Sequence, residues 1–261
     1  MNDMELAMVE ILKQGKEKYG FVGVKAEFEA EGTRMDELLK LVCIGRKAGV
    51  KIALKIGGCE AVSDLLTAKQ IGIDYIIAPM VESSYALSKY IAAKNKVYDS
   101  SSTQKPKFLF NLETHNTFKN LKEMVVQALV ENGADGIVFG RVDYTSSRSM
   151  TRAEIDSDVI TADCLEVAKI CKDNNLELVV GGGVSTDSVD ALRKIKGTFL
   201  SRFETRKVVF SSDTLDAKDI EHRLQHAVKF ELLWLKNKKE YYSTIAQEDD
   251  KRIKMLEERV N

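Results

Sequence analysis

The 261-residue sequence predicts an α/β protein of the TIM-type (β/α)8 barrel class. Hydrophobic residues make up 44% of the chain, which is enough for one large core. Short apolar runs alternate with helical segments of about 10–15 residues, the pattern of parallel βαβ units. Two prolines against 16 glycines also favour long helices alternating with strands. Seven such units favour a closed barrel over an open doubly wound sheet, with one of the eight strands irregular or missing.

The elements follow from the spacing of apolar residues along the chain. An amphipathic helix is expected first, over residues 5–18, because its apolar residues recur at helical spacing. Seven runs rich in aliphatic and aromatic residues predict the strands 22–28, 51–56, 75–78, 108–112, 136–139, 176–180 and 199–210. The segments between them predict helices over 35–47, 61–70, 85–94, 121–131, 161–174 and 185–194.

The sequence from Asp213 onward is typical of helix almost to its last residue. We therefore expect a barrel domain over residues 1–212 and a helical extension over 213–261. A helix of about 45 residues is too long for one face of a barrel. The extension either packs on the barrel as ordinary helices or docks on a neighbouring subunit, and the second possibility predicts a homo-oligomer assembled through the C-terminal helices.

Charge and cysteine content exclude several classes of partner. The formal net charge of −1 gives no reason to expect nucleic acid or an anionic membrane as the main partner. The four cysteines form no CxxC pair and are expected to be reduced and mostly buried. No run reaches the roughly 18 apolar residues of a membrane span, and the first residues lack the apolar core of a signal peptide. A cytoplasmic protein is expected.

Charged side chains alternate with apolar ones along several predicted strands. In the first strand Lys25, Glu27 and Glu29 share the face opposite the apolar residues, and this face is expected to point into the barrel. The same alternation turns inward the side chains of Lys55, Asn111 and Glu113, groups Arg141 with Asp143, and groups Arg202 with Glu204 and Arg206.

Charges inside a barrel are costly unless they pair, bind a metal or meet a charged ligand. These residues gather toward the carboxyl ends of the strands, where active sites of TIM barrels lie. Buried ion pairs, for example Glu204 between two arginines, would account for single residues. The ensemble predicts a site.

Two carboxylates in this set have the arrangement of a metal site. Glu113 and Asp143 end strands that are separated by one βα unit, which allows both to ligate a hard divalent cation and leaves positions for substrate and water. Mg²⁺ or Mn²⁺ is the expected cofactor.

Other segments have a functional and a structural interpretation that the sequence does not separate. Gly182 and Gly183, before a predicted helix, either cradle an anion with bare backbone N–H groups or form a tight turn. His115, just after Glu113, is either an acid/base group or an exposed loop residue. His222 and His226 are expected to be exposed helix residues, and the serines near residue 146 lack the Gly-x-Ser-x-Gly elbow of serine hydrolases.

Three motifs resemble the HpcH/HpaI aldolase and citrate lyase family of metal-dependent (β/α)8 enzymes. Ile77-Ala-Pro-Met-Val-Glu-Ser83 is similar to that family's Val-Pro-Met-Val-Glu-Ser, and Asn111-Leu-Glu-Thr114 resembles its Gln-x-Glu-Thr. Asp135-Gly-Ile-Val-Phe-Gly-Arg-Val-Asp-Tyr144 resembles its Gly-Val-Phe-Ile-Gly-Pro-x-Asp-Leu. The order and spacing match over about residues 21–150. The resemblance implies that Glu113 and Asp143 bind the metal, and it adds Glu82 to the substrate-binding candidates.

The sequence departs from that family at groups that handle the substrate. The family's Glu-His pair corresponds to Glu27-Phe28 or to Glu29, where no histidine follows. Lys55 takes the place of the arginine that binds the 2-oxo acid, and it lacks the two-pronged guanidinium. Arg141 replaces a proline. A different substrate pose is therefore expected.

The resemblance and the inward charges together predict a metal-dependent carbon–carbon lyase of the aldolase type. Its substrates would be a small 2-oxo acid or its enolate and an aldehyde that could be sugar-like or phosphorylated. Lys55, Arg141, Arg202 or Arg206 would hold carboxylate or phosphate groups, and Glu27, Glu29 or His115 would move the proton. Two alternatives are a Schiff-base aldolase that uses Lys25 or Lys55, and a barrel that binds oxo acids without catalysis.

Overall fold

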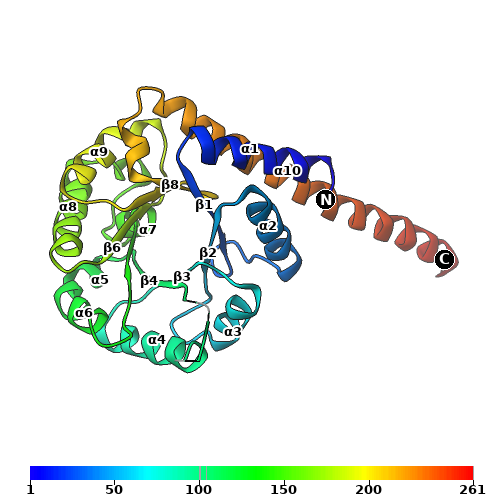
Figure 1. Cartoon of the computed structure of the whole chain (residues 1–261). Helices are drawn as coiled ribbons and strands as arrows, with labels where there is room; N and C mark the ends of the chain where they lie inside the picture. The colour runs from blue at the N-terminus through cyan, green and yellow to red at the C-terminus, as the bar shows by residue number, and fades with distance from the viewer. Residues whose placement is uncertain (100, 104, 261) are drawn as a thin grey trace.

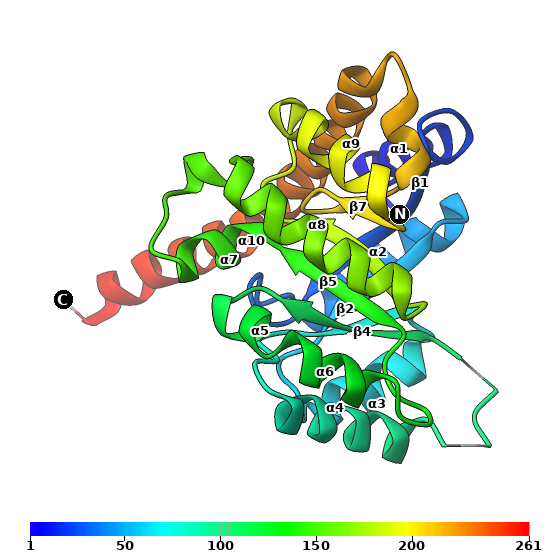
Figure 2. The ribbon, with the colours of Figure 1, turned by 90° about the vertical axis from the view of Figure 1, so that its left-hand side faces the viewer.

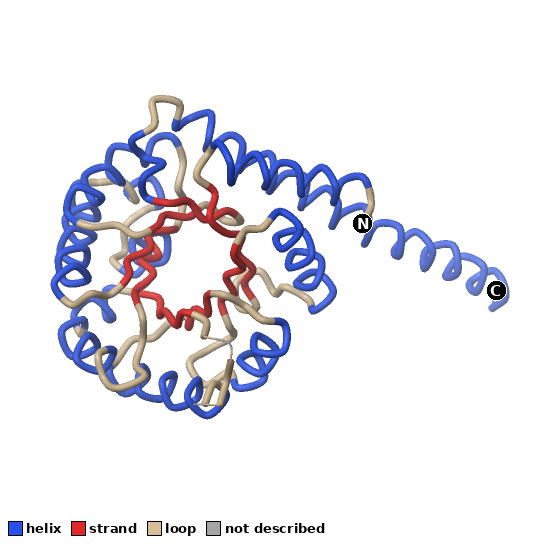
Figure 3. The backbone as a smooth tube through the Cα atoms, in the orientation of Figure 1, coloured by secondary structure: helices blue, strands red, loops and turns tan. Residues whose placement is uncertain are grey.

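Eight strands close into a barrel in chain order, with the helices outside it (Figure 3). The structure is a computed structural model that describes residues 1–99, 101–103 and 105–260. From β1 to β7 each strand runs parallel to the next. The strands are β1 (Phe21–Glu27), β2 (Lys51–Lys55), β3 (Tyr75–Ala78), β4 (Lys107–Leu112), β5 (Gly136–Gly140), β6 (Glu177–Gly181), β7 (Arg202–Glu204) and β8 (Val208–Ser211).

The helices between the strands form a ring around the barrel (Figure 1). Most follow the expected boundaries within a few residues, and polar caps fix their ends: Ser83, for example, accepts a hydrogen bond from the Ala86 N–H at the start of α4. The helices are α1 (Asp3–Lys18), α2 (Met35–Ala48), α3 (Val62–Ile71), α4 (Ser84–Val97), α5 (His115–Lys119), α6 (Leu121–Ala128), α7 (Arg141–Ser147), α8 (Asp158–Asp173), α9 (Val189–Thr198) and α10 (Ile220–Val260).

The strand that the sequence analysis missed is β8, which lies inside the segment expected to be one long strand. Residues 199–210 instead contain β7, a tight turn and β8, and β8 pairs antiparallel with both β7 and β1. Thr205 closes the turn, since its N–H donates to the Val208 carbonyl at 2.9 Å and its hydroxyl accepts from the Val208 N–H at 3.2 Å. The barrel therefore has all eight strands, but its last strand runs in the reverse direction.

The hydrophobic core has two parts because the strands alternate. Outward residues of the strands join the inner faces of the helices in one large core, to which β1 contributes Val24 and Ala26. Inside the barrel a small separate layer is formed by Ala53, Ile77, Leu109, Val138 and Val179. The charged residues at the carboxyl ends of the strands lie directly above this apolar layer.

The C-terminal helix α10 extends well beyond the barrel (Figures 1 and 2). Its first half is anchored: Phe230 and Trp234 are buried, and α1 runs antiparallel beside it, with Asn2 donating to Asn237 at 2.7 Å. His226 is not exposed as expected, since its ring contacts Phe21 and its Nε2 lies 3.1 Å from the Ile11 carbonyl oxygen. In the part of the chain that the structure describes, no helix combines the length and hydrophobicity that a membrane crossing requires.

Candidate active site

A cavity of about 120 Å³ opens at the carboxyl ends of the strands. It lies above the apolar layer inside the barrel, and residues from β1 to β7 surround it. The charged and amide side chains that line it are Lys25, Glu27, Lys55, Asn111, Glu113, Asp143 and Glu204. The alternation of the strands predicted that all of these face inward, but Asp143 reaches the cavity for a different reason.

Glu113 lies at the centre of the cavity wall, directly after β4, and is only 1% exposed. One carboxylate oxygen accepts the Met80 N–H at 2.9 Å. The other accepts from Asn111 Nδ2 at 2.5 Å and from the Lys55 ammonium at 3.2 Å. A buried carboxylate held by three donors is fixed in position.

Lys55 places a positive charge next to Glu113. Its ammonium also pairs with Glu29 at 3.1 Å. Burial lowers the pKa of Lys55, but the Glu113, Glu27 and Glu29 carboxylates together raise it above its ordinary value. Lys55 is therefore an ammonium ion at neutral pH.

Lys25, on the neighbouring strand β1, forms a second cation in the cavity lining. Its ammonium lies 2.5 Å from Glu204 and 2.9 Å from Glu27. Burial lowers the pKa of Lys25, and the two carboxylates raise it by more, so it stays well above its ordinary value. The expectation that Glu204 lies between two arginines is wrong, because its partner is Lys25.

A further ion pair, which was not predicted from the sequence, lies in the turn between β7 and β8. The Lys207 ammonium bonds the Glu31 carboxylate and is 3% exposed. Arg206 pairs with the other oxygen of Glu31 at 3.1 Å, and its side chain is largely exposed, so it lies on the rim outside the cavity. The grouping of Arg206 with Glu204 fails because the chain turns between them. A polar triplet between two apolar runs, Thr205 to Lys207, was the signal that could have revealed the turn.

Asp143 reaches the cavity from α7 rather than from a strand. The helix begins at Arg141, immediately after β5, so Arg141 and Asp143 do not share a face as predicted. Asp143 lies in the first turn, is exposed, and lines the cavity with Glu113. Gly140 lets the two elements approach, because a Cβ there would lie 3.0 Å from the Glu113 Cβ.

The Arg141 side chain is fully engaged by neighbouring backbone and side-chain groups and does not line the cavity. Its side chain, 1% exposed, donates to the carbonyl oxygens of Gly181 at 3.2 Å and Gly182 at 3.0 Å, and it pairs with Asp156. These contacts tie α7 to the turn after β6. The geometry gives Arg141 a structural position.

The glycine turn after β6 packs against the start of α7. Gly182 has a φ of +81°, and a Cβ there would lie 2.7 Å from the Val142 backbone nitrogen. Gly182 lines the cavity, whereas Gly183 packs against Ile155. Close packing between two turns accounts for both glycines.

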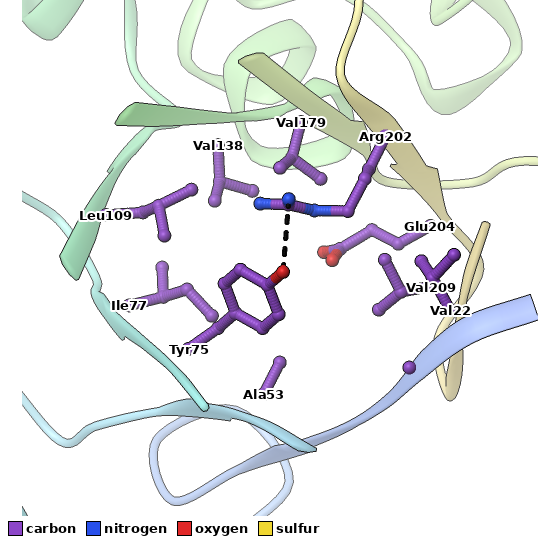
Figure 4. Close-up of a pocket in the computed structure, with 11 residues that line it drawn as sticks. Val22, Ala53, Tyr75, Ile77, Leu109, Val138, Val179, Arg202, Glu204 and Val209 are labelled. Carbon is purple, nitrogen blue, oxygen red and sulfur yellow. Dashed lines mark hydrogen bonds between the residues drawn. The ribbon is translucent and has the colours of Figure 1, made fainter. Parts of the chain in front are cut away.

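Arg202 lies at the other end of the barrel. It begins β7, and its guanidinium lies 4.3 Å from the Tyr75 ring centre and donates to the Tyr75 hydroxyl at 3.4 Å (Figure 4). It also pairs with Glu177 at 2.6 Å. Arg202, Tyr75 and the apolar layer inside the barrel line a small cavity of about 20 Å³. Arg202 and Glu204 share a face of β7 as predicted, but the Arg202 side chain extends to Tyr75 and Glu177 and does not line the charged cavity.

Two further candidates lie beside the cavity without lining it. His115 opens α5, and its ring stacks on Phe118. Burial lowers the pKa of His115, and Lys119 and Arg148 lower it further. Glu82 accepts a hydrogen bond from the Thr114 hydroxyl at 2.6 Å. These contacts place both residues between the loops that follow β3 and β4.

The oxygen atoms around Glu113 suit a hard divalent cation. Mg²⁺ is commonly held by one or two carboxylates and keeps water or substrate oxygens as its other ligands. Glu113 and Asp143 line one cavity, and the buried Asn111 Oδ1 has no hydrogen-bond partner among the described residues. Within the same residues no three His, Cys, Asp or Glu side chains form a complete metal cluster. The donor set thus fits a cation that leaves several positions for other ligands.

The fold and the cavity define a (β/α)8-barrel protein with a charged site at the carboxyl ends of its strands. The sequence model of the HpcH/HpaI aldolase/citrate lyase family matches residues 41–197, more than half of the chain. The chain therefore belongs to the HpcH/HpaI aldolase/citrate lyase family, and this membership supports a lyase-type function.

Solved structures of the same family share the fold at low sequence identity. An HpcH/HpaI aldolase from Desulfitobacterium hafniense superposes with a TM-score of 0.59 at 12% identity, covering 76% of this chain and 82% of that one. An HpcH/HpaI aldolase/citrate lyase family protein from Burkholderia cenocepacia gives 0.60 at 11% identity, covering 85% and 90%. A variant of the citrate synthase SbnG gives 0.55 at 15% identity, covering 76% and 81%. No curated protein matches the chain by sequence.

Proposed function

We propose that the protein is a carbon–carbon lyase of the aldolase type that acts on a 2-oxo acid or its enolate and uses Mg²⁺ or Mn²⁺. The observation that carries the proposal is the buried Glu113 carboxylate, held by Asn111 and Lys55 in a cavity that Asp143 also lines. Glu113 and Asp143 would hold the cation. When bound there, the cation would polarise the oxo group and stabilise the enolate.

Lys55 is the group that would hold the substrate carboxylate. Its ammonium faces the cavity next to Glu113, so an oxo acid whose oxo group lies near Glu113 would have its carboxylate near Lys55. An ammonium and a carboxylate form a charge-assisted hydrogen bond. The ion pair with Glu29, which is partly exposed, would open when substrate enters.

A carboxylate at the mouth of the cavity would move the proton. In cleavage it accepts the proton of the substrate hydroxyl while the carbon–carbon bond breaks, an aldehyde leaves, and the bonding electrons remain in the enolate. Glu27, which lines the cavity, and Glu29, which lies beside it, are the candidates, because both pair with lysines that line the site. His115 is a weaker candidate, since its ring lies outside the lining and stacks on Phe118.

The Schiff-base alternative has less support. A nucleophilic lysine needs a lowered pKa, whereas carboxylates raise the pKa of both Lys25 and Lys55. Lys207, in the turn between β7 and β8, is a lysine whose pKa is lowered, because burial outweighs the effect of Glu31. Its ammonium is engaged by Glu31, outside the cavity lining.

Calorimetric titration of metal-stripped protein with Mn²⁺, with and without pyruvate, tests the proposal. We expect saturable Mn²⁺ binding that pyruvate strengthens. Glu113→Gln and Asp143→Asn should each weaken Mn²⁺ binding roughly 10- to 100-fold, because each removes a charged oxygen ligand. Asp190→Asn is the matched control, since Asp190 has a side chain 92% exposed on α9 and should bind Mn²⁺ as the wild type does. Full Mn²⁺ binding by both site variants would overturn the metal assignment.

Lys55→Met separates substrate binding from metal binding. The variant should bind pyruvate roughly 10- to 100-fold more weakly, the loss expected for one charge-assisted hydrogen bond. Its Mn²⁺ affinity in the absence of pyruvate should be equal to that of the wild type or higher, because a positive charge next to Glu113 is removed. A parallel screen of aldehydes with pyruvate then measures turnover, and tight binding without turnover would instead support a barrel that only binds oxo acids.

A further inference from the structure

An apolar stripe runs along α10 on the side that faces away from the barrel. Val228, Leu232 and Leu235 are about half exposed even though neighbouring residues of the same turns are buried. The stripe continues into the part of the helix that projects beyond the barrel (Figures 1 and 2). There Ile253, Leu256 and Val260 are 42–87% exposed.

These residues recur with the spacing of a coiled-coil seam. Steps of four and three residues lead from Val228 to Val260 without interruption. We call this set the α10 seam; its members are Val228, Leu232, Leu235, Lys239, Tyr242, Ala246, Asp249, Ile253, Leu256 and Val260. Two members, Lys239 and Asp249, are charged, and both are exposed. A seam of this length on one 41-residue helix is typical of a helix that packs against another helix.

The α10 seam is complementary to itself when a second copy runs antiparallel. If the two-fold axis lies beside Thr244, Lys239 of each copy faces Asp249 of the other, so the two charged members neutralise each other. In the same register apolar members face apolar members: Val228 with Val260, Leu232 with Leu256, and Leu235 with Ile253. Tyr242 faces Ala246 while its hydroxyl stays bonded to Glu37 of its own chain at 2.7 Å, so this layer lies beside α2.

The residues that flank the seam fit the same register. Lys229 faces Glu257, Lys236 faces Asp250, and Glu231 faces Arg259 of the second copy. Ile245 faces its own counterpart near the axis. One flanking pair, Lys238 with Arg252, has like charges, and Lys238 already pairs with Glu37 of its own chain at 2.9 Å.

A parallel arrangement in register does not have this complementarity. It would place Lys239 against Lys239 and Asp249 against Asp249 inside the seam, and like charges at such positions are strongly unfavourable. The charges therefore select one direction as well as one register.

We propose that the α10 seam binds the α10 seam of a second copy of this chain, antiparallel, with the two-fold axis beside Thr244. The helix is about 60 Å long at 1.5 Å per residue, which gives room for all ten facing layers, each of the five pairings occurring twice. The first half of α10 is fixed to the barrel through Phe230 and Trp234, whose side chains point away from the seam. The projecting half of each helix then reaches the anchored half of the other.

Charge reversal tests this register directly. In sedimentation velocity or light scattering the wild-type chain of 29.2 kDa should assemble with the mass of a dimer or a multiple of it. Lys239→Asp and Asp249→Lys each place two pairs of like charges in the seam and should weaken this association at least about 10-fold. The double variant Lys239→Asp with Asp249→Lys restores both pairs and should associate as the wild type does.

Lys251→Asp is the matched control, because it makes the same charge change on the same helix at a position that faces away from the seam. It should leave the mass unchanged. A monomeric wild type, an unchanged mass in both single variants, or no recovery in the double variant would overturn the proposal. Far-ultraviolet circular dichroism of every variant checks that the barrel is folded, and the recovery in the double variant separates a broken interface from a misfolded chain.

Discussion

Lys25 shows how the residues of the site depend on one another. Its ammonium lies between Glu204 and Glu27, inside a barrel where an unpaired charge would be strongly destabilising. Lys25 and Lys55 each pair with two carboxylates, and Asp143 adds a further carboxylate to the cavity lining. The cavity therefore carries an excess of negative charge without a ligand, which a bound cation would offset, and an incoming oxo acid would exchange one carboxylate partner of Lys55 for another.

Acid should weaken this arrangement through Glu27. Burial raises the pKa of the Glu27 carboxyl, but Lys25, Lys55 and Lys207 together lower it by more, so the pKa lies below the ordinary 4.5. A group whose folded-state pKa is lowered stabilises the fold above its unfolded pKa and loses that contribution as the pH falls through the folded value. In urea titrations the stability of the wild type should decrease as the pH falls below 4.5, and Glu27→Gln should show a smaller decrease over the same interval. Equal acid dependence in both proteins would contradict this assignment.

Arg141 gives a second prediction at the scale of single residues. Replacing it by Met removes one partner of a buried ion pair and two bonds to backbone carbonyls, which should lower the free energy of unfolding by about 3–5 kcal/mol. Arg206→Met should cost less than about 1 kcal/mol, because that arginine is 61% exposed. Urea denaturation of both variants measures the difference, and similar losses would show that the Arg141 contacts do not hold the loop.

Single side chains were predictable wherever a strand carried them. Alternation alone turned Lys25, Lys55, Asn111 and Glu113 inward, and all four line the cavity. The rule failed at Arg141, because the helix starts at that residue and the period changes from two to 3.6. It also says nothing about depth along a strand, which is why Arg202 was placed in the site although it lies on the floor of the barrel.

At the scale of elements, the turn after β6 and the start of α7 form one packed unit. The φ of Gly182 is positive, and a Cβ there would lie only 2.7 Å from the Val142 nitrogen, so there is no space for a side chain. Gly182→Ala should therefore destabilise the protein by about 2 kcal/mol or more. Gly58→Ala is the control, since a Cβ there meets no atom within 4 Å, and its effect should stay within about 0.5 kcal/mol.

Thermal denaturation of Gly182→Ala and Gly58→Ala measures this difference in stability. A Gly182→Ala protein as stable as Gly58→Ala would show that the loop relaxes without cost. If instead the variant is destabilised and also loses Mn²⁺ binding, the turn would be shown to position Asp143 through α7.

The element that sequence patterns could not reveal is the β7–β8 hairpin. Short hairpin turns are usually recognised in a sequence by glycine or asparagine, and the Thr205-Arg206-Lys207 turn has neither. Without that signal the apolar residues on both sides join into one apparent strand. The parallel units before it were found, because each has a helix of its own between two apolar runs.

At the scale of the whole molecule, α10 belongs to the barrel in its first half and projects from it in its second. Tyr242 marks the change: its hydroxyl donates to Glu37 at 2.7 Å, and Arg34 lies 4.7 Å from its ring centre. The division of the chain at residue 213 stays a prediction, which truncation can test.

Ending the chain at Thr244 should leave the barrel folded, with a free energy of unfolding within about 1 kcal/mol of the full chain measured as a monomer. Ending it at Asp219 removes Phe230 and Trp234, each worth about 3–5 kcal/mol when buried, and should prevent folding because domains are stable by only about 5–15 kcal/mol. Circular dichroism melting of the two truncated chains measures this. A folded chain ending at Asp219 would make residues 213–261 a separable domain.

The reversed direction of β8 changes which chemical groups a substrate meets at the rim. In TIM barrels the loops after the seventh and eighth strands, with the N-terminus of a short helix, often form a cup of backbone N–H groups for a phosphate. Here β8 leaves the barrel at the opposite end, and the place of that cup is taken by a hairpin turn whose Lys207 is neutralised by Glu31. On the proposed function, we therefore expect turnover to favour aldehydes without a phosphate group, and inorganic phosphate to compete poorly with pyruvate for Lys55.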